Sequence, residues 1–309
     1  MQKFNSKFDV SVIIPTYDRS KLLNYTLLSL LQQDIDKDRF EVIVADDGSS
    51  DNTREIAAQY AKLMNVKYVY QADKGYRPAS ARNMGVRAAE GHICMFIDSG
   101  ILLNANCVGE HIDYYTGLDD QIALVGYVYG FERTKDSEKK LMELIDPANA
   151  AEAIVKVSKE EIYFDIRDEH YIRYNDQIQD LPAPWYYFWT CHVSVPRAEL
   201  IAAGLFDSKY DGRWGMEDND LAFRLVQQGI KIHFLRSAQA IHYPHDKNKA
   251  ERRAEGYHNC EYFNAKYGTL ETQLFLDCYL DVSEFTDINR ISIEMSKAKT
   301  RMTNDEVAA

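Results

Sequence analysis

Strand-like and helix-like segments alternate through the first hundred residues of this chain. Residues 10–14 form a largely apolar stretch of strand length, and apolar residues then recur at helical spacing through residues 22–31. The same pair recurs at residues 40–45 and 56–64. Two further strands and the helix between them are expected at residues 66–70, 92–97 and 79–89. Because right-handed crossovers join parallel strands, the pattern predicts an α/β fold with a mostly parallel central sheet and helices on both faces.

Three polar loops follow these predicted strands, at residues 15–19, 46–51 and 98–100. The carboxyl ends of parallel strands meet at one edge of a sheet, and ligands bind there. The first loop contains neither the Gly-x-Gly-x-x-Gly pattern of dinucleotide-binding folds nor the Gly-x-x-x-x-Gly-Lys pattern of P-loop enzymes. The sequence therefore predicts a ligand site at this edge but counts against both of those classes.

Beyond residue 104 the regular alternation ends. Residues 131–180 are charged and tyrosine-rich with helical patches, and we interpret them as a variable insertion or lid. We expect the main domain to span residues 1–246 and a helical extension to span residues 247–309. The end of that extension, from residue 296, is small, polar and charged, which predicts disorder. Within the main domain, short strands are expected at residues 231–235 and 238–241.

The composition narrows the class of protein and its compartment. A formal net charge of −12 excludes a sequence-independent nucleic-acid binder, which needs a basic face. The five cysteines show no paired metal-ligand spacing and are odd in number, so we expect a reducing, cytoplasmic setting. No apolar run approaches the roughly eighteen residues of a spanning helix, so we expect no integral membrane segment. Peripheral contact of the C-terminal run with the inner face of a membrane remains open.

Three carboxylates lie close together at Glu217, Asp218 and Asp220, just after Trp214 and Gly215. Acidic residues suit the first turn of a helix because they face the positive end of its dipole, so helix capping is one interpretation. Gly215 lets the backbone bend sharply and bring the Trp214 ring over the carboxylates. A carboxylate beside an apolar ring is a natural general base, and this is the second interpretation. Both interpretations are open on this segment alone.

Five motifs together resemble glycosyltransferase family 2. They are VSVIIPTYDR at residues 10–19, EVIVADDGSSD at 41–51, ASARNMG at 79–85, FIDSG at 96–100, and the segment 214–225. The later motif is especially similar to bacterial chondroitin-type polymerases and animal β-galactosyltransferases. The resemblance implies the GT-A fold over residues 1–246, a UDP-sugar donor, a divalent metal ion that is Mn²⁺ or Mg²⁺, and inversion at the anomeric carbon.

The resemblance also assigns roles to residues. It implies a nucleotide and diphosphate site made by Pro15, Thr16, Tyr17, Asp46, Asp47, Arg77, Arg82, Asp98 and Ser99. Metal binding falls to Asp98, His242 and His245, although Gly100 stands where the family's Asp-x-Asp signature has its second aspartate. Asp218 is the expected catalytic base with Glu217 beside it, and the expected sugar-binding residues are Trp214, Gly215, Asp220, Trp189 and His192.

Structural roles remain open for several of these residues. Asp46 to Gly48 could form an ordinary Asp-Gly turn, and Arg82 could pair with Asp46 or Asp98 to order the loops. A histidine at a strand end, such as His242, is often structural.

The leading functional interpretation is an inverting glycosyltransferase that moves a hexose or N-acetylhexosamine from a UDP-sugar to an acceptor hydroxyl in glycan or glycoconjugate biosynthesis. Two alternatives remain. The first is a nucleotide-sugar-binding subunit whose catalysis is impaired by Gly100. The second is a transferase whose acceptor is a natural product or a protein.

Overall fold

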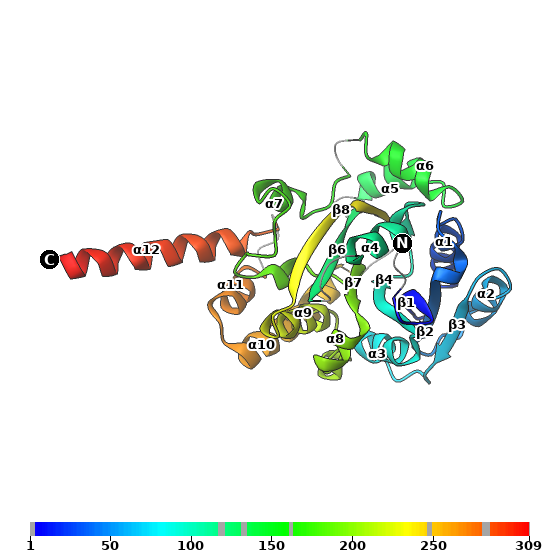
Figure 1. Cartoon of the computed structure of the whole chain (residues 1–309), viewed down its shortest axis with the longest axis horizontal. Helices are drawn as coiled ribbons and strands as arrows, with labels where there is room; N and C mark the ends of the chain where they lie inside the picture. The colour runs from blue at the N-terminus through cyan, green and yellow to red at the C-terminus, as the bar shows by residue number, and fades with distance from the viewer. Residues whose placement is uncertain are drawn as a thin grey trace.

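A computed structural model describes residues 4–116, 121–130, 135–160, 163–245, 249–279 and 285–308. One eight-stranded sheet, in the order β3-β2-β1-β4-β7-β6-β8-β5, forms its centre (Figure 1). The predicted first half is confirmed: four parallel strands, β1 to β4, are joined by helices α1 to α3. Their bounds are β1 Phe8–Thr16, α1 Ser20–Leu31, β2 Phe40–Asp46, α2 Thr53–Tyr60, β3 Val66–Tyr70, α3 Pro78–Ala88 and β4 Gly91–Ile97.

The second half of the sheet mixes strand directions. Strand β7 is antiparallel to both of its neighbours, β4 and β6, while β8 runs parallel to β6 and antiparallel to β5. The elements are β5 Ile101–Leu103, α4 Cys107–Tyr115, β6 Ile122–Tyr129, β7 His192–Pro196 and β8 Lys231–His242. The two short strands expected at residues 231–235 and 238–241 are one strand, β8. The pairing of β8 with β6 jumps from Leu235 to Gln239, so the intervening residues leave the ladder and produce the apparent break in the sequence.

The described part of residues 131–180 packs against the sheet. It contains α5 Lys135–Leu144, α6 Ala150–Val157 and α7 Asp168–Arg173. Leu141, Ile154 and Tyr171 are buried in the same core as the sheet residues. Asp165 and Arg167 form a fully buried ion pair at 2.7 Å. Residues 131–134, 161 and 162 of the expected lid lie outside the described residues.

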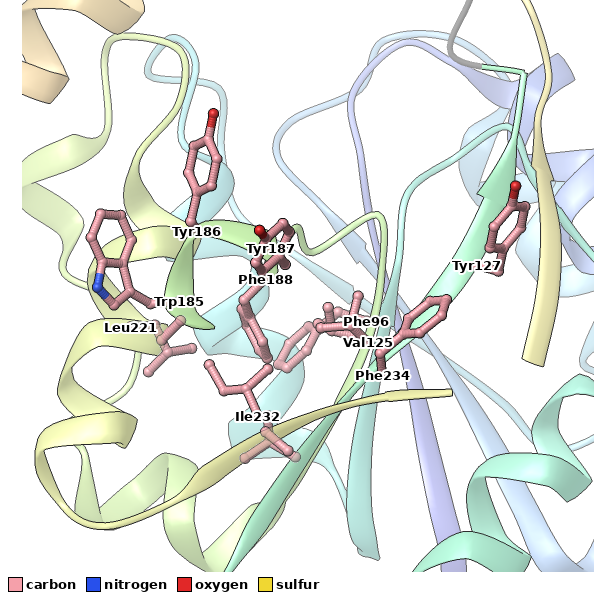
Figure 2. Close-up of a cluster of buried hydrophobic side chains, with 14 of the residues drawn as sticks. Phe96, Val125, Tyr127, Trp185, Tyr186, Tyr187, Phe188, Leu221, Ile232 and Phe234 are labelled. Carbon is pink, nitrogen blue, oxygen red and sulfur yellow. The ribbon is translucent and has the colours of Figure 1, made fainter. Parts of the chain in front are cut away.

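An aromatic core supports the strands on one side. Figure 2 shows the Phe188 side chain directed toward the sheet residues Phe96 and Ile232, and all three are buried. This aromatic run includes the 3-10 helix Pro184–Tyr187, and it leads directly into β7. The remaining short elements are the 3-10 helices Lys37–Arg39 and Ser208–Tyr210, and helices α8 Arg197–Ala202 and α9 Glu217–Gln227. The amide of Asn219 donates to the Trp185 carbonyl at 3.0 Å, which fixes the start of α9 against the core.

The C-terminal part is helical, with α10 Lys249–Tyr267, α11 Leu270–Cys278 and α12 Ile288–Ala308. Helix α12 projects away from the rest of the molecule (Figure 1). Residues 296–308, which we expected to be disordered, continue this helix. Its first turns are anchored, because Asn289 accepts a hydrogen bond from the Ala183 N–H at 2.6 Å and Ser292 donates to Glu271 at 2.7 Å. Among the described helices, none is both long enough and apolar enough to cross a membrane.

Candidate active site

The carboxyl ends of β1 and β2 lie side by side, with Thr16 paired to Asp46. The Asp46 carboxylate is fully buried. It accepts hydrogen bonds from the Gly48 and Ser49 N–H groups at 3.1 and 2.8 Å and from the Tyr68 hydroxyl at 2.6 Å. Gly48 has φ of +101°, a conformation that favours glycine. Asp46 therefore holds the turn and does not face the open edge, which corrects its expected role in nucleotide binding.

Asp47 is the neighbouring carboxylate, and it links three elements. Its Oδ1 accepts from the Gln71 amide and pairs with the Arg77 guanidinium, both at 2.7 Å, while its Oδ2 accepts from the Arg77 N–H at 2.8 Å. Desolvation raises the pKa of Asp47, although these partners oppose that effect. The structure thus brings Asp47 and Arg77 together. It leaves the Tyr17 ring 45% exposed beside them, with the Tyr17 hydroxyl donating to Asp73 at 3.0 Å.

Arg82 lies at the centre of the site. Its Nη1 donates to Glu217 Oε1 at 2.7 Å and its Nη2 to Asp98 Oδ1 at 3.1 Å. Burial alone would lower the pKa of Arg82, but the negative charges of Asp98 and Glu217 outweigh burial and raise it. One guanidinium therefore joins α3, the end of β4 and the start of α9. The expected pairing with Asp98 is present, whereas Asp46 is not a partner.

The three carboxylates at the start of α9 have different surroundings. Glu217 is buried against Arg82. Asp218 remains partly exposed, and it accepts hydrogen bonds from the Asn219 N–H at 2.8 Å and the Thr190 N–H at 3.3 Å. Desolvation, followed by repulsion from Glu217, raises the pKa of Asp218 to about 7. Asp218 is thus the carboxylate of this group that a ligand can reach.

Asp220 has a structural role. It is fully buried, and it pairs with Arg224 at 2.8 Å and Lys266 at 2.6 Å. The Tyr210 and Tyr267 hydroxyls donate to it at 3.2 and 2.8 Å. With its oxygens occupied by these partners, Asp220 ties α9 to α10 and is not placed to bind a sugar.

The backbone before α9 is strained. Gly215 and Met216 have φ of +90° and +75°, and a left-handed conformation costs a residue with a side chain about 1–2 kcal/mol. The amide of Asn259 holds this loop from α10. It donates to the Gly215 carbonyl at 2.8 Å and lies within 3.3 to 3.4 Å of the carbonyls of Tyr210, Arg213 and Trp214. The Trp214 ring is 36% exposed, so it can offer an apolar surface to a ligand.

We expect Asn259→Ala to lower kcat with little change in the KM of the donor. The substitution removes a donor from partly buried carbonyl groups, which costs up to about 1–3 kcal/mol, and it frees the loop that leads into Glu217 and Asp218. Steady-state kinetics and urea unfolding measure the two effects. Asn264→Ala is the matched control, because Asn264 lies on the same helix and donates to Gln273 at 2.7 Å, away from the loop. Equal losses of kcat in both variants would contradict this positioning role.

The two histidines at and just after the end of β8, His242 and His245, are only partly available to a metal ion. The His242 and His245 rings stack with centroids 5.1 Å apart. His245 Nε2 lies 2.8 Å from Arg19 Nη1 and its Nδ1 lies 3.1 Å from the Tyr243 carbonyl oxygen, so both of its ring nitrogens are engaged. His245 is therefore poorly placed as a ligand, contrary to expectation. Across the described ranges, Asp98, His242 and His245 do not form a group of three converging ligands.

The conformation of the loop after β4 explains why Gly100 stands where the Asp-x-Asp signature has its second aspartate. Gly100 has φ of +100°, and its N–H donates to the Thr26 hydroxyl at 2.9 Å. An aspartate at this position would be strained. Ser99 is buried and donates to the Pro15 carbonyl at 3.2 Å, which ties the first and third loops together. Asp98 keeps 43% of its side chain exposed, so it stays accessible at the edge.

Trp189 and His192, two of the expected sugar-binding residues, have different surroundings. The Trp189 ring is half-buried, with the Arg167 guanidinium 4.7 Å from its centroid. His192 is fully buried, and its Nε2 lies 3.3 Å from Cys107 Sγ. His192 therefore points into the interior and does not line the edge, which corrects its assignment as a sugar-binding residue.

Several residues that organise the site carry no local sequence signal. Asp211 accepts hydrogen bonds from the N–H groups of Ala79 and Ser80 at 3.0 and 3.3 Å, so it caps α3, the helix that carries Arg82. The Thr190 N–H and the Asn259 amide act in the same way on Asp218 and on its loop. Each contact spans at least 28 residues of chain, beyond the reach of motif spacing.

This chain belongs to glycosyltransferase family 2. The family described as "Glycosyl transferase family 2" matches residues 11–180, and the family described as "N-terminal domain of galactosyltransferase" matches residues 176–246. The expected family is thus confirmed.

Two curated relatives and two solved structures illustrate the similarity. The chain is 34% identical over 266 residues to validoxylamine A glucosyltransferase of Streptomyces hygroscopicus subsp. jinggangensis, covering 86% of this chain and 63% of that protein. It is 32% identical over 253 residues to chondroitin synthase of Escherichia coli, covering 79% of this chain and 36% of that protein. The chain therefore spans less than two thirds of the length of either relative.

The solved structures establish the fold. One is S. aureus TarS 1-349 in complex with UDP-GlcNAc, at a TM-score of 0.59 and 17% identity, with 91% of this chain and 68% of that chain covered. Another is the mannosyltransferase PcManGT from Pyrobaculum calidifontis in complex with GDP-Man and Mn²⁺, at a TM-score of 0.56 and 18% identity, with 88% of this chain and 70% of that chain covered. The expected GT-A fold is confirmed.

Proposed function

We propose that this chain transfers a hexose or N-acetylhexosamine from a UDP-sugar to an acceptor hydroxyl, with inversion at the anomeric carbon. One observation carries the proposal. Asp218 is a reachable carboxylate with a raised pKa, and it stands beside the Arg82 ion pairs that reach the exposed Asp98. A general base needs a pKa near the working pH and an open position, and Asp218 has both.

In the proposed reaction, the acceptor oxygen attacks the anomeric carbon as Asp218 takes its proton. The bond from that carbon to the diphosphate oxygen breaks, and UDP leaves with the bonding electron pair. A single displacement inverts the configuration. Glu217 Oε2 is buried and has no hydrogen-bond partner in the described structure, so it is available to accept from a sugar hydroxyl. Trp214 would offer its ring to the sugar.

The nucleotide would lie across the loops after β1 and β2. The exposed Tyr17 ring can stack on the base, and Asp47 can accept from a uracil N–H or a ribose hydroxyl. Thr16 Oγ1 is buried without a partner among the described residues, so it too can bind the nucleotide. Residues 1–246 would thus supply the site, while α10 holds the Trp214 loop in place.

The cysteines form no disulfide, which supports a reducing, cytoplasmic setting.

Two residues of this site, Asp98 and His242, would hold a divalent cation. Asp98 has an exposed carboxylate of which Arg82 engages one oxygen, and His242 is half-buried at the end of β8, paired with Ile101 of β5. Carboxylate and imidazole suit Mn²⁺, and the diphosphate and water would complete the coordination. When bound, the cation would stabilise the charge of the leaving diphosphate.

Calorimetric titration with UDP, with and without Mn²⁺, tests the donor site. We expect binding that strengthens with Mn²⁺, and we expect His242→Ala to lose that gain because the imidazole ligand is gone. His258→Ala is the control, since this exposed histidine on α10 contacts Glu261 at 3.2 Å and not the site. Absence of UDP binding under both conditions would contradict the proposed donor. Binding that is indifferent to Mn²⁺ would move the phosphate role to Arg82 and its neighbours.

The activity should depend on pH through Asp218. Because desolvation and Glu217 raise the pKa of Asp218 to about 7, the carboxylate takes its basic form only as the pH rises through that value. We expect kcat/KM to increase with pH and to level off above about 7. A pH series of initial rates at low donor concentration measures this. An acidic limb near the ordinary aspartate pKa of about 4 would argue against Asp218 as the base.

A further inference from the structure

Three metal-ligating side chains meet in the interior, away from the site described above. Cys107 and His111 lie four residues apart on α4, so they share one helix face, and His192 begins β7 opposite them. His192 Nε2 lies 3.3 Å from Cys107 Sγ and 3.1 Å from His111 Nε2. All three side chains are completely buried. We call this group the Cys107–His111–His192 cluster.

Hydrogen bonds cannot satisfy the whole cluster. Both imidazoles are fully buried, and burial disfavours a charged ring. Each Nε2 of a neutral ring then carries either one hydrogen or one lone pair. His192 Nε2 is nevertheless within reach of two partners, and it can make a full hydrogen bond to only one of them. The three atoms therefore converge without forming a complete hydrogen-bonded set.

We propose that the cluster binds a transition-metal ion that prefers thiolate and imidazole ligands, namely Zn²⁺ or Cu⁺. The Cys107 thiol loses its proton to solvent as the metal–sulfur bond forms, and the two Nε2 atoms donate their lone pairs. The three ligand atoms lie within 4.8 Å of one another, as a shared ion requires. Both ions take thiolate and imidazole ligands, although Zn²⁺ would need a fourth ligand beyond these three, whereas Cu⁺ would leave the complex with the thiolate electrically neutral in this dry surrounding.

The residues around the cluster support a built site. His111 Nδ1 lies 2.8 Å from Ser194 Oγ, which the Tyr115 hydroxyl also contacts at 3.2 Å, so the ring is oriented from its far side. Metal-bound histidines are commonly held in this way. Gly126 provides the space for the His192 ring, because a Cβ at that position would lie 2.2 Å from the ring. An ion here would fix the start of β7, two residues after Thr190, whose N–H contacts Asp218.

Metal analysis of the full-length protein tests this proposal. The chain is unfolded with chelator and refolded with Zn²⁺, with Cu⁺ under reducing conditions, or with Co²⁺, and bound metal is measured by mass spectrometry after desalting. We expect one tightly held ion per chain and, with Co²⁺, a thiolate-to-cobalt charge-transfer absorption band. Cys107→Ser should lower metal retention more than about tenfold. Cys94→Ser is the matched control, since Cys94 is equally buried but lies outside the cluster.

A metal ion bound at the donor site can be distinguished from one bound in the Cys107–His111–His192 cluster. His242→Ala should leave the tightly held ion and its absorption band unchanged, and failure of UDP binding would leave this expectation intact. If Cys107→Ser does not fold, the wild-type metal content and the cobalt–thiolate band still decide. Wild-type protein that refolds with none of the three metals bound would overturn the proposal. So would equal metal retention in Cys107→Ser and Cys94→Ser.

Discussion

Asp218→Asn is expected to lower kcat by a factor of about 10²–10⁴, the range that a positioned general base contributes. The amide keeps the shape of the side chain but cannot take the proton of the acceptor hydroxyl. Donor binding should persist, because Asp218 contacts the Asn219 and Thr190 N–H groups and not the loops after β1 and β2. Transferase assays and UDP titration of the same preparation measure both quantities.

The stability of this variant separates catalysis from helix capping. The folded-state pKa of Asp218 is raised, so its proton favours the folded state at low pH, and this contribution is lost as the pH rises through about 7. At pH 8 the ionised carboxylate faces Glu217 and opposes folding, and asparagine removes that charge. We therefore expect Asp218→Asn to be at least as stable as wild type at pH 8. If Asp218 mainly stabilised the first turn of α9 through its charge, the variant would lose stability by about 0.3–1 kcal/mol at pH 8 and retain its activity.

The first half of the fold could be predicted because its signals are local. Strands β1 and β2 are largely apolar and almost wholly buried, which is typical of strands covered on both faces, and the loops that follow them are polar. The carboxyl edge could then be located from topology alone. The apolar run of residues 122–129 is equally strand-like, and β6 could have been predicted from it.

The side-chain partners could not be predicted, because they are distant in the sequence. Arg82 and Glu217 are 135 residues apart, and Lys266 reaches Asp220 across 46 residues. The three carboxylates of α9 look alike in the sequence, but burial and these cations make one of them structural, one an ion-pair partner and one accessible. The register of β7 likewise turns His192 inward, toward Cys107, and a strand's buried face is not evident in so short an apolar run.

Arg82→Met should be the most damaging change to the stability of the site. It leaves Glu217 buried without a cation and removes the link from α9 to Asp98. Breaking a buried ion pair by removing one partner costs about 3–5 kcal/mol, and urea unfolding measures that loss. Turnover should fall as well, because Glu217 and Asp98 would no longer be held together. Arg54→Met is the control, since Arg54 is exposed and lies over the Tyr68 ring, away from α9.

A double-mutant cycle with Glu217→Gln identifies the cause of that loss. If the cost arises from an uncompensated buried charge, Arg82→Met combined with Glu217→Gln should recover most of the stability, because neither charge remains. Activity should not recover, since the neutral pair holds neither Asp98 nor the start of α9 in its wild-type position. Strictly additive losses of stability would mean that the two residues are energetically independent. Recovery of turnover together with stability would mean that the ion pair only maintains the fold, and that the charge of Arg82 has no part in the reaction.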